Sequence, residues 1–500
     1  MSNKFYTNFA AHKGKLYLRE WDKNREQSYK LPITPSLYYV VEKESEHKSI
    51  YGANLAKLDF SNGFEAKEWL QQYENQKSNI FGYSHYEYVM INEMYPGNMI
   101  EYVDLNQLMI GYVDIEHEVE GRNATVENPT EKINLISYGR KGRGYKGDII
   151  CWGWGNATVK NKDSTYIKVN SESELLMAFL NEWRKDYPNA ISGWFSSSFD
   201  LVYIINRMKM ILGEDLTKTL SPFNIINQKM VKMRFGTENL QYQLLGIDNL
   251  DYMELYRKFQ QKQRESYKLD YIAEIELKDN KIAFDGTFKD FYDNHYQTFV
   301  EYNIHDVRLV MKLEDKLGYL AQAYNMAYQA KANACDVFGT VRIWDVLIAN
   351  RLASRNIHVP YYSPPSESGE SYGGGFVKDP LVGMYEYMAS VDATSLYPSN
   401  MRAKNTSPET LLNPALFIRI TPDDVLYKTD LYKEASKTAR EHNAVLAPNG
   451  AMFSKEKQGI IPELAEYFFN QRVIEKNKGK QYAKACEDIE RILKSRGSKV

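Results

Sequence analysis

Two acidic side chains able to chelate a metal ion follow an apolar segment early in the chain. Asp114 and Glu116 come directly after residues 109–113, whose sequence MIGYV predicts a strand. On a strand, residues i and i+2 lie on one face, so both carboxylates point the same way and can bind one cation. The same tripeptide recurs at 488–490 in a predicted charged helix, where the carboxylates diverge. Because an isolated pair of this kind is more often solvated surface, it needs further support.

Two later segments place further acidic groups beside predicted secondary structure. Asp200 follows a predicted strand at 190–194 and opens a predicted helix, where an aspartate can equally serve as a cap. Tyr302 and Asp306 lie four residues apart in a predicted helix over 299–313, so they share one face. An exposed aspartate beside a packed tyrosine is the plainer alternative for that pair.

In this order and spacing, the three acidic segments resemble the three exonuclease motifs of the DEDD nuclease superfamily. The resemblance implies that Tyr302 orients the attacking water and that two divalent cations are bound by Asp114, Glu116, Asp200 and Asp306. Hydrolysis of a phosphodiester needs an activated water and a stabilised leaving oxygen, which two cations about 3.5–4 Å apart supply. Mg²⁺ or Mn²⁺ suits carboxylate ligands.

The subtype of the nuclease motif follows from the position five residues before Asp306. Superfamily members that use a histidine base carry it there, whereas this chain has Glu301, so the motif is similar to the tyrosine type. Lys281 is a further candidate, as positive charge near the phosphate, and a plain surface lysine is the alternative. Phe195 departs from the residue pattern of the family, whose members usually carry a substrate-contacting asparagine at this position.

A second constellation lies at residues 392–399, whose sequence is DATSLYPS. It resembles motif A of family B DNA polymerases, D-x-x-S-L-Y-P-S, and matches at every fixed position. The resemblance implies that Asp392 binds both catalytic metals and that the backbone through Ser395 and Leu396 cradles a nucleoside triphosphate. It also implies that the Tyr397 ring excludes ribonucleotides by a clash with the 2′-hydroxyl.

Further segments extend this resemblance along the chain. Residues 372–378 (YGGGFVK) resemble the Y-x-G-G element between exonuclease and polymerase modules, and 447–450 with 469–472 resemble the palm-to-fingers passage of T-even phage replicative DNA polymerases. Arg472 and Lys476 face one way on a helix. The resemblance implies that they grip the triphosphate, and a solvated basic face is the alternative.

The sequence patterns around these groups predict a multidomain fold of the α/β and α+β classes. The first hundred residues alternate apolar runs with polar turns and predict a β-rich domain, whereas the next two hundred alternate strands and helices. The resemblance makes the latter an RNase H-like DEDDy exonuclease domain, a mixed sheet flanked by helices. Local patterns further predict a β-hairpin at 231–244, a linker at 363–375, a strand at 387–391 and a charged helix from about 462 onward.

The expected domains follow from these elements together with the resemblance. They are an N-terminal domain at 1–107 with a return segment at 319–363, an exonuclease domain at 108–318 with a hairpin inserted at about 230–245, a partial palm at 364–458, and the first part of the fingers at 459–500.

Composition excludes several other classes of protein. The formal charge of −2 and 43% hydrophobic residues fit an ordinary globular chain, and a near-neutral sum can still contain a basic channel. No apolar run reaches the roughly 18 residues of a membrane span, so no membrane partner is expected. The three cysteines form no paired motif, which fits the cytoplasm, that of the host cell if the gene is a phage's.

The sequence ends at Val500 without the motifs K-x3-N-S-x-Y-G or Asp-Thr-Asp-Ser, so we expect no polymerisation by this chain alone. The favoured hypothesis is one subunit of a split replicative DNA polymerase that proofreads by 3′→5′ exonuclease action. Its expected partners are primer-template DNA, a single-stranded 3′ end, dNTP, a second polymerase chain with the remaining fingers, palm and thumb, and a sliding clamp bound through that chain. The alternatives are a stand-alone or truncated exonuclease and a non-catalytic DNA- or mRNA-binding remnant.

Overall fold

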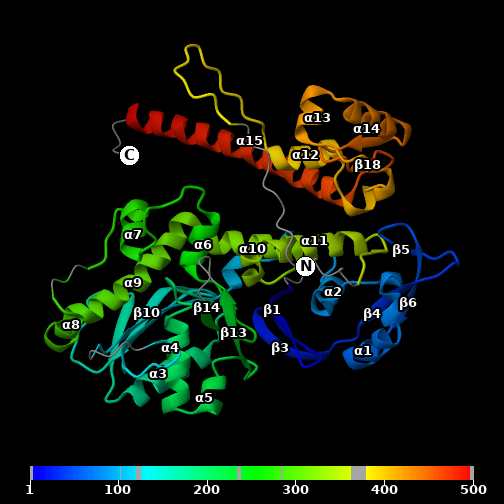
Figure 1. Ribbon diagram of the computed structural model, residues 1–500. Coiled ribbons are helices and arrows are strands. Elements are labelled where there is room, and N and C mark those ends of the chain that lie inside the picture. Colours follow the sequence, from blue (N-terminus) through cyan, green and yellow to red (C-terminus); the bar gives the residue numbers. More distant parts are fainter. Residues whose placement is uncertain are drawn as a thin grey trace. The chain divides into compact units, whose positions relative to one another are not determined.

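The computed structural model describes residues 4–101, 103–119, 125–232, 238–282, 284, 286–361 and 379–495. Its contacts divide the chain into two units, each described separately below (Figure 1). The first unit contains residues 1–39 and 56–351, and the second contains residues 40–55 and 352–500. The finer division into four domains stays a prediction.

The first unit begins with a three-stranded antiparallel sheet of β1 (Phe5–His12), β2 (Lys15–Asp22) and β3 (Arg25–Pro32). Two-residue turns join these strands, and both residues of each turn have positive φ: Lys13 and Gly14 in the first, Lys23 and Asn24 in the second. Turns of this handedness match the twist of the flanking strands. The predicted β-rich N-terminal region is therefore confirmed.

The remaining N-terminal elements are short. The strand β4 (Ser36–Val40) pairs with β7 (Ile80–Phe81) in antiparallel fashion. Two α-helices follow in this part of the chain, α1 (Gly63–Gln72) and α2 (Tyr86–Met94). Short 3-10 helices lie at Glu74–Asn79, Met99–Glu101, Leu105–Gln107 and Ala334–Phe338.

The second sheet of this unit is mixed, with the strand order β11-β10-β9-β8-β12-β15. The strand β9 pairs in antiparallel fashion with both β8 and β10, whereas the pairs β10–β11, β8–β12 and β12–β15 are parallel. Their bounds are β8 Ile110–His117, β9 Ile133–Gly142, β10 Tyr145–Gly153, β11 Ser164–Lys168, β12 Ala190–Ser192 and β15 Asp248–Asn249.

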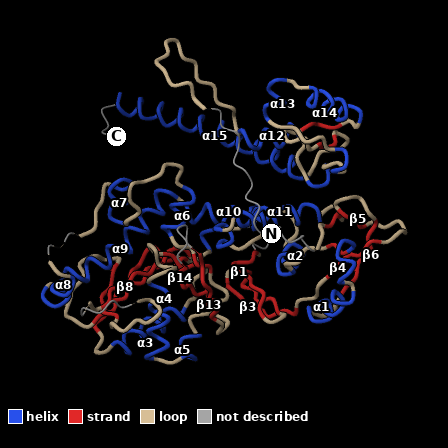
Figure 2. The backbone as a smooth tube through the Cα atoms, viewed as in Figure 1, coloured by secondary structure: helices blue, strands red, loops and turns tan. Residues whose placement is uncertain are grey.

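Helices cover both faces of this sheet, as Figure 2 shows. On one face, Val113 and Ile115 of β8 share a buried cluster with α3 (Glu172–Lys185) and α4 (Asp200–Ile211). On the other, Tyr112 shares a cluster with α9 (Tyr296–Leu317). This alternation is the period of two that a strand imposes, and it confirms the predicted mixed sheet flanked by helices.

The predicted hairpin is present as β13 (Ile226–Lys232) and β14 (Glu238–Leu244), and its turn lies outside the described residues. Buried Arg19 of β2 donates to the carbonyl oxygen of Gly246, two residues after β14, at 2.7 Å and to that of Pro188, two residues before β12, at 2.6 Å. The other helices of this unit are α5 Glu214–Lys218, α6 Tyr252–Phe259, α7 Leu269–Leu277, α8 Phe288–Asn294, α10 Tyr319–Ala330 and α11 Thr340–Ala353, which runs two residues into the second unit.

In the second unit, β5 (His47–Ser49) pairs with β16 (Ile357–His358) and with the start of β6 (Asn54–Asp59). A helical part follows, in which Arg402 of α12 forms an ion pair with Glu466 of α15 at 3.0 Å. Its elements are α12 Leu396–Lys404, α13 Pro422–Tyr427, α14 Asp430–Glu441, β17 Ala444–Leu446, β18 Met452–Ser454, α15 Ile460–Ser495, and 3-10 helices at Pro408–Thr410 and Pro414–Leu416.

One predicted element is wrong. Residues 387–391 form no strand, and Tyr387 and Val391 are 100% and 94% exposed. A strand depends on hydrogen bonds from a neighbour, and no strand pairs with this segment in the part of the chain that the structure describes. The predicted linker at 363–375 and the Y-x-G-G segment at 372–378 lie outside the described residues. Among the helices searched, none combines the length and the apolar character that crossing a bilayer requires.

Candidate active site

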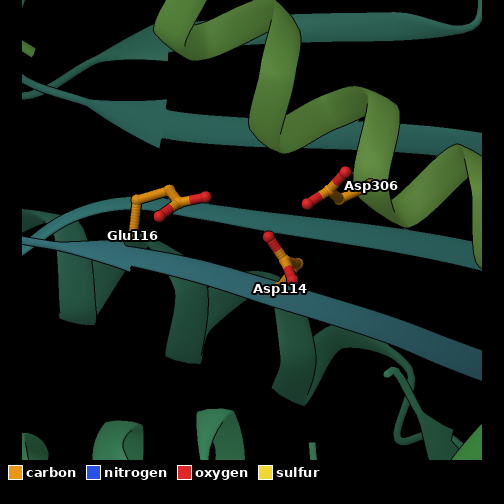
Figure 3. A group of neighbouring side chains, drawn as sticks. All are labelled: Asp114, Glu116 and Asp306. Carbon is orange, nitrogen blue, oxygen red and sulfur yellow. The ribbon is translucent and has the colours of Figure 1, made fainter. Parts of the chain in front are cut away.

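Three carboxylates meet between β8 and α9, as Figure 3 shows. Asp114 and Glu116 lie within β8, on the face that α9 covers, and Asp306 comes from α9 itself. One oxygen from each lies within 4.8 Å of the other two. The i,i+2 spacing on a strand and a helix packed over that strand are what bring these groups together.

Asp200 lies at the first position of α4 and is 4% exposed. Its Oδ1 accepts the backbone N–H of Ile115 at 3.0 Å, which ties the start of α4 to the middle of β8. Asp200 is not part of the three-carboxylate group, although its negative charge raises the pKa of Asp114. Asp200, the predicted fourth ligand, therefore acts on the site through its charge, and its carboxylate is held by a hydrogen bond from the backbone of β8.

Burial is the main cause of the raised pKa values in this cluster. It raises the pKa of Asp114 and of Glu116 well above their usual values, and the neighbouring carboxylates raise them further. Burial also raises the pKa of Asp200 to about 7, although the N–H of Ile115 acts in the opposite direction. So many buried acids close together resist ionisation unless positive charge is added.

The geometry fits a divalent cation. Oδ1 of Asp306 is buried and has no hydrogen-bond partner among the described residues, so a lone pair remains for a ligand. It belongs to the residue that shares the 4.8 Å cluster with Asp114 and Glu116. A hard cation prefers such carboxylate oxygens and would compensate their mutual repulsion.

Lys281 lies in the site. The sequence alone left open whether it is a site residue or a surface lysine. Its Nζ forms an ion pair with Asp306 and donates to the Tyr302 hydroxyl at 3.1 Å. Burial disfavours its charge, but the carboxylates led by Asp306 outweigh that effect and raise the Lys281 pKa. Burial raises the pKa of Tyr302 to about 12, so its hydroxyl keeps its proton at neutral pH.

Asn303 is a site residue that sequence reasoning missed. It is fully buried on α9, and its Nδ2 donates to Oδ2 of Asp114 at 2.6 Å. The thiol of Cys151 donates to the Asn303 Oδ1 at 3.9 Å, which fixes the orientation of the amide. The sequence contained a signal for this role. Asn303 precedes Asp306 by three residues, and residues three apart on a helix share a face.

Phe195 has φ of 65°, a left-handed conformation that is uncommon for a bulky residue and easier for asparagine. Asp251, which caps α6, holds this turn by accepting the N–H groups of Phe195 at 3.2 Å and Ser197 at 3.0 Å. The turn leads directly into Asp200. Asp251 therefore fixes the backbone of this turn, in which Phe195 stands where the resemblance implies a substrate-contacting asparagine.

The second predicted constellation is exposed. Asp392 lies in an exposed loop, and Tyr397 at the start of α12 is 76% exposed. Ser395 is the N-cap of α12 in a left-handed conformation, followed by Leu396 as the first helical residue. Among the described residues, the acidic group able to hold a metal is the one at Asp114, and Asp392 has no such neighbours.

Arg472 and Lys476 lie one turn apart in the long helix α15, and both are exposed. Their placement agrees with the predicted helix and shared face. Their role in binding a triphosphate stays a prediction.

Two family models match this chain over successive segments. "DNA polymerase family B, exonuclease domain" matches residues 57–272, and "DNA polymerase family B" matches residues 339–495. This chain belongs to DNA polymerase family B. The first match includes Asp114, Glu116 and Asp200, and the second includes Asp392. Asp306 lies between the two matched segments, so its place in the family B site rests on its geometry.

Individual relatives support the same family. The chain is 29% identical to the DNA-directed DNA polymerase of Escherichia phage RB69 over 496 residues and 28% identical to that of Enterobacteria phage T4 over 492 residues. Each comparison covers 94% of this chain and 53% of the relative, so the chain spans about half the length of these polymerases. The DNA polymerase delta catalytic subunit of Dictyostelium discoideum is 26% identical over 59% of this chain and 26% of its own length.

Proposed function

We propose that this family B chain removes nucleotides from the 3′ end of DNA by metal-dependent hydrolysis. The observation that carries the proposal is the convergence of Asp114, Glu116 and Asp306 between β8 and α9, with an unpartnered buried oxygen on Asp306. The family B exonuclease match over residues 57–272 supports it. The buried acids have no evident structural use, because their raised pKa values disfavour the ionised folded state.

The proposed metal ligands are Asp114, Glu116, Asp200 and Asp306, and the proposed ions are Mg²⁺ or Mn²⁺. Two such ions would activate a water molecule and stabilise the leaving 3′ oxygen. The side chains of the protein perform the positioning. Tyr302 keeps its proton and can orient the attacking water by hydrogen bonding.

Lys281 and Asn303 hold the ligating and orienting groups in place. Lys281 contacts both Asp306 and the Tyr302 hydroxyl, so it fixes one relative to the other and adds positive charge beside the phosphate. Asn303 fixes Asp114 through its 2.6 Å hydrogen bond. Groups held this way need little reorganisation when substrate binds.

The same proposal gives the second unit a part of a polymerase site. Asp392 would bind the catalytic metals, the backbone at Ser395 and Leu396 with the Tyr397 ring would receive the dNTP, and Arg472 with Lys476 would grip its triphosphate. A single aspartate is too few ligands for two ions. In this proposal a second chain supplies the other metal-binding aspartate together with the remaining fingers, palm and thumb, and carries the contact to a sliding clamp.

Exposed apolar side chains support such a second chain. Between residues 381 and 397, several large ones are more than half exposed, among them Leu381, Val382, Met384, Tyr387, Met388 and Val391. Large apolar side chains exposed close together in the sequence are typical of segments that bind another surface, and in this proposal that surface belongs to the second chain.

Degradation of a single-stranded oligonucleotide labelled at its 5′ end tests the exonuclease proposal. With Mg²⁺, the chain should give a ladder that shortens from the 3′ end, and Asp114→Ala with Glu116→Ala should abolish it. The matched control is Asp488→Ala with Glu490→Ala, which changes the same tripeptide on the exposed part of α15 and should leave the ladder intact. Equal digestion by both double variants would refute the assignment.

A further inference from the structure

A cleft in the first unit includes Glu118, the residue that follows the end of β8. It measures about 580 Å³ and is lined by three aromatic side chains, Trp154, Tyr292 and Tyr296. This volume falls within the roughly 300–1,000 Å³ of small-ligand pockets. None of these residues belongs to the predicted site.

The position of the cleft relates it to the carboxylate cluster. Glu118 in its wall is two residues beyond Glu116, a separation of about 7 Å along an extended chain. Tyr296 precedes Tyr302 by six residues on α9, about 9 Å along a helix. A DNA strand whose 3′ end reaches the carboxylates therefore has a neighbouring nucleotide within reach of the cleft.

The aromatic walls are held in place before any ligand binds. The indole Nε1 of Trp154 donates to Oδ1 of Asn134 at 2.9 Å. The Tyr296 ring lies against Gly155, where an added Cβ would come within 2.4 Å of the ring, so only glycine allows this contact. Rings that are already ordered lose little conformational entropy on binding.

A polar group in the same cleft points to a ligand. Asn134 lines the cleft and is 3% exposed, and its Nδ2 has no hydrogen-bond partner among the described residues. Because Oδ1 of the same amide already accepts from Trp154, the free group is a donor. An unpaired buried donor is costly unless a ligand or a water supplies an acceptor.

The charges of the cleft favour an uncharged ligand over a phosphate. Glu118 and Asp293 contribute carboxylates to its lining, and Glu172 is already paired with Arg207 through a 2.7 Å hydrogen bond. One lysine, Lys132, partly offsets them. A nucleobase is neutral, presents a face for stacking and carries acceptors on its edge.

We propose that this cleft binds a base of the single-stranded DNA next to the nucleotide being removed. The base stacks on Trp154 and Tyr292 and accepts a hydrogen bond from Asn134. This inference rests on the proposed exonuclease function. It assigns Trp154 a part in holding the substrate strand in register.

Exonuclease kinetics on oligonucleotides with one abasic site, placed in turn at each of the last few positions, test the cleft. For the wild-type chain, one position should raise KM by about tenfold, the effect of losing one stacked base. Trp154→Ala should raise KM similarly on the intact oligonucleotide and should abolish the extra effect of that one abasic position. Its kcat should change little, because the lost contact is uniform binding.

Two further variants separate stacking from folding. Trp154→Phe keeps a ring in the cleft and should retain the position-specific abasic effect, and Phe64→Ala changes an aromatic side chain that is 71% exposed and lies outside the cleft. An unchanged KM for Trp154→Ala, or abasic effects that it leaves intact at every position, would overturn the inference. If the wild-type chain digests nothing, the proposed exonuclease function fails instead. Binding of intact and abasic oligonucleotides, measured by fluorescence anisotropy with the same variants, then decides the cleft by itself.

Discussion

Asn303 is buried on α9 and donates its Nδ2 hydrogen to Asp114 at 2.6 Å. Asn303→Ala removes this hydrogen bond without removing a proposed metal ligand. Loss of a group that orients a ligand typically lowers metal affinity or activity by about 10–100-fold. We expect the Mg²⁺ concentration for half-maximal digestion to rise within that range. Asn294→Ala breaks an exposed amide-to-carboxylate hydrogen bond with Asp290 and serves as the control, with no expected change.

Protonation of the buried acids predicts how stability depends on pH in the absence of metal. The folded pKa of Asp200 is about 7, above the roughly 3.9 of an unfolded aspartate, so the folded chain binds more protons between these values. Its stabilising contribution is present below about pH 4 and is lost as pH rises through about 7. The melting temperature of the chain in EDTA should therefore fall from pH 5 to pH 8.

Asp200→Asn should reduce that slope, since the amide does not titrate. Added Mg²⁺ should raise the melting temperature more at pH 8 than at pH 5, because protons compete with the cation for the same oxygens. An equal effect of Mg²⁺ at both pH values would contradict the raised pKa values.

Local spacing predicted which side chains share a face within one element but not which contacts join the elements. Asp114 and Glu116 share a strand face, and Tyr302 and Asp306 share a helix face, so each pair was visible in the sequence. The contact of Lys281 with Asp306 joins a segment before α8 to α9, and the contact of Asn303 with Asp114 joins α9 to β8. Contacts between elements depend on tertiary packing, which no short periodicity encodes.

Among the elements, β2 braces the exonuclease sheet through one arginine. The Arg19 side chain is 3% exposed, and its guanidinium forms an ion pair with Glu26 and donates to the carbonyls of Pro188, Tyr187 and Gly246. Arg19→Ala leaves three carbonyls without this donor, whereas Glu26 keeps its ion pair with Arg143 at 2.7 Å. Leaving buried acceptors unsatisfied in this way costs about 1–3 kcal/mol for each group.

Urea denaturation of Arg19→Ala measures this loss in the free energy of unfolding. Lys57→Ala is the control, because its ion pair with Asp59 is exposed and such pairs contribute about 0–1 kcal/mol. Similar losses in both variants would show that the Arg19 network does not brace the fold.

The sequence predicted those elements well whose hydrophobic pattern and stabilising contacts lie within the same short segment. The amphipathic pattern of α9 and the paired runs of β13 and β14 each contain their own stabilising contacts. Residues 387–391 have a strand-like composition but no neighbouring strand in the described part of the chain, so the pattern alone did not produce a strand. Strand formation depends on a partner that the pattern cannot specify.

For the whole molecule, the chain spans 53% of the phage polymerases that it resembles. We expect primer extension with dNTPs only after addition of a second polypeptide that contains an Asp-Thr-Asp-Ser motif. The assay uses the primer-template with each chain alone and with both together. Extension by this chain unaided would contradict the proposed second chain, and Asp392→Ala should abolish the activity of the mixture.

The central claim is that the acids of β8 and α9 form a metal-binding nuclease site. Calorimetric titration of Mn²⁺ into the metal-free chain tests it most directly, with Asp306→Ala compared with Asp488→Ala plus Glu490→Ala. The wild-type chain and the surface variant should each bind about two ions. Binding should be lost or strongly weakened in Asp306→Ala. Mn²⁺ binding to Asp306→Ala with wild-type stoichiometry and affinity would contradict it.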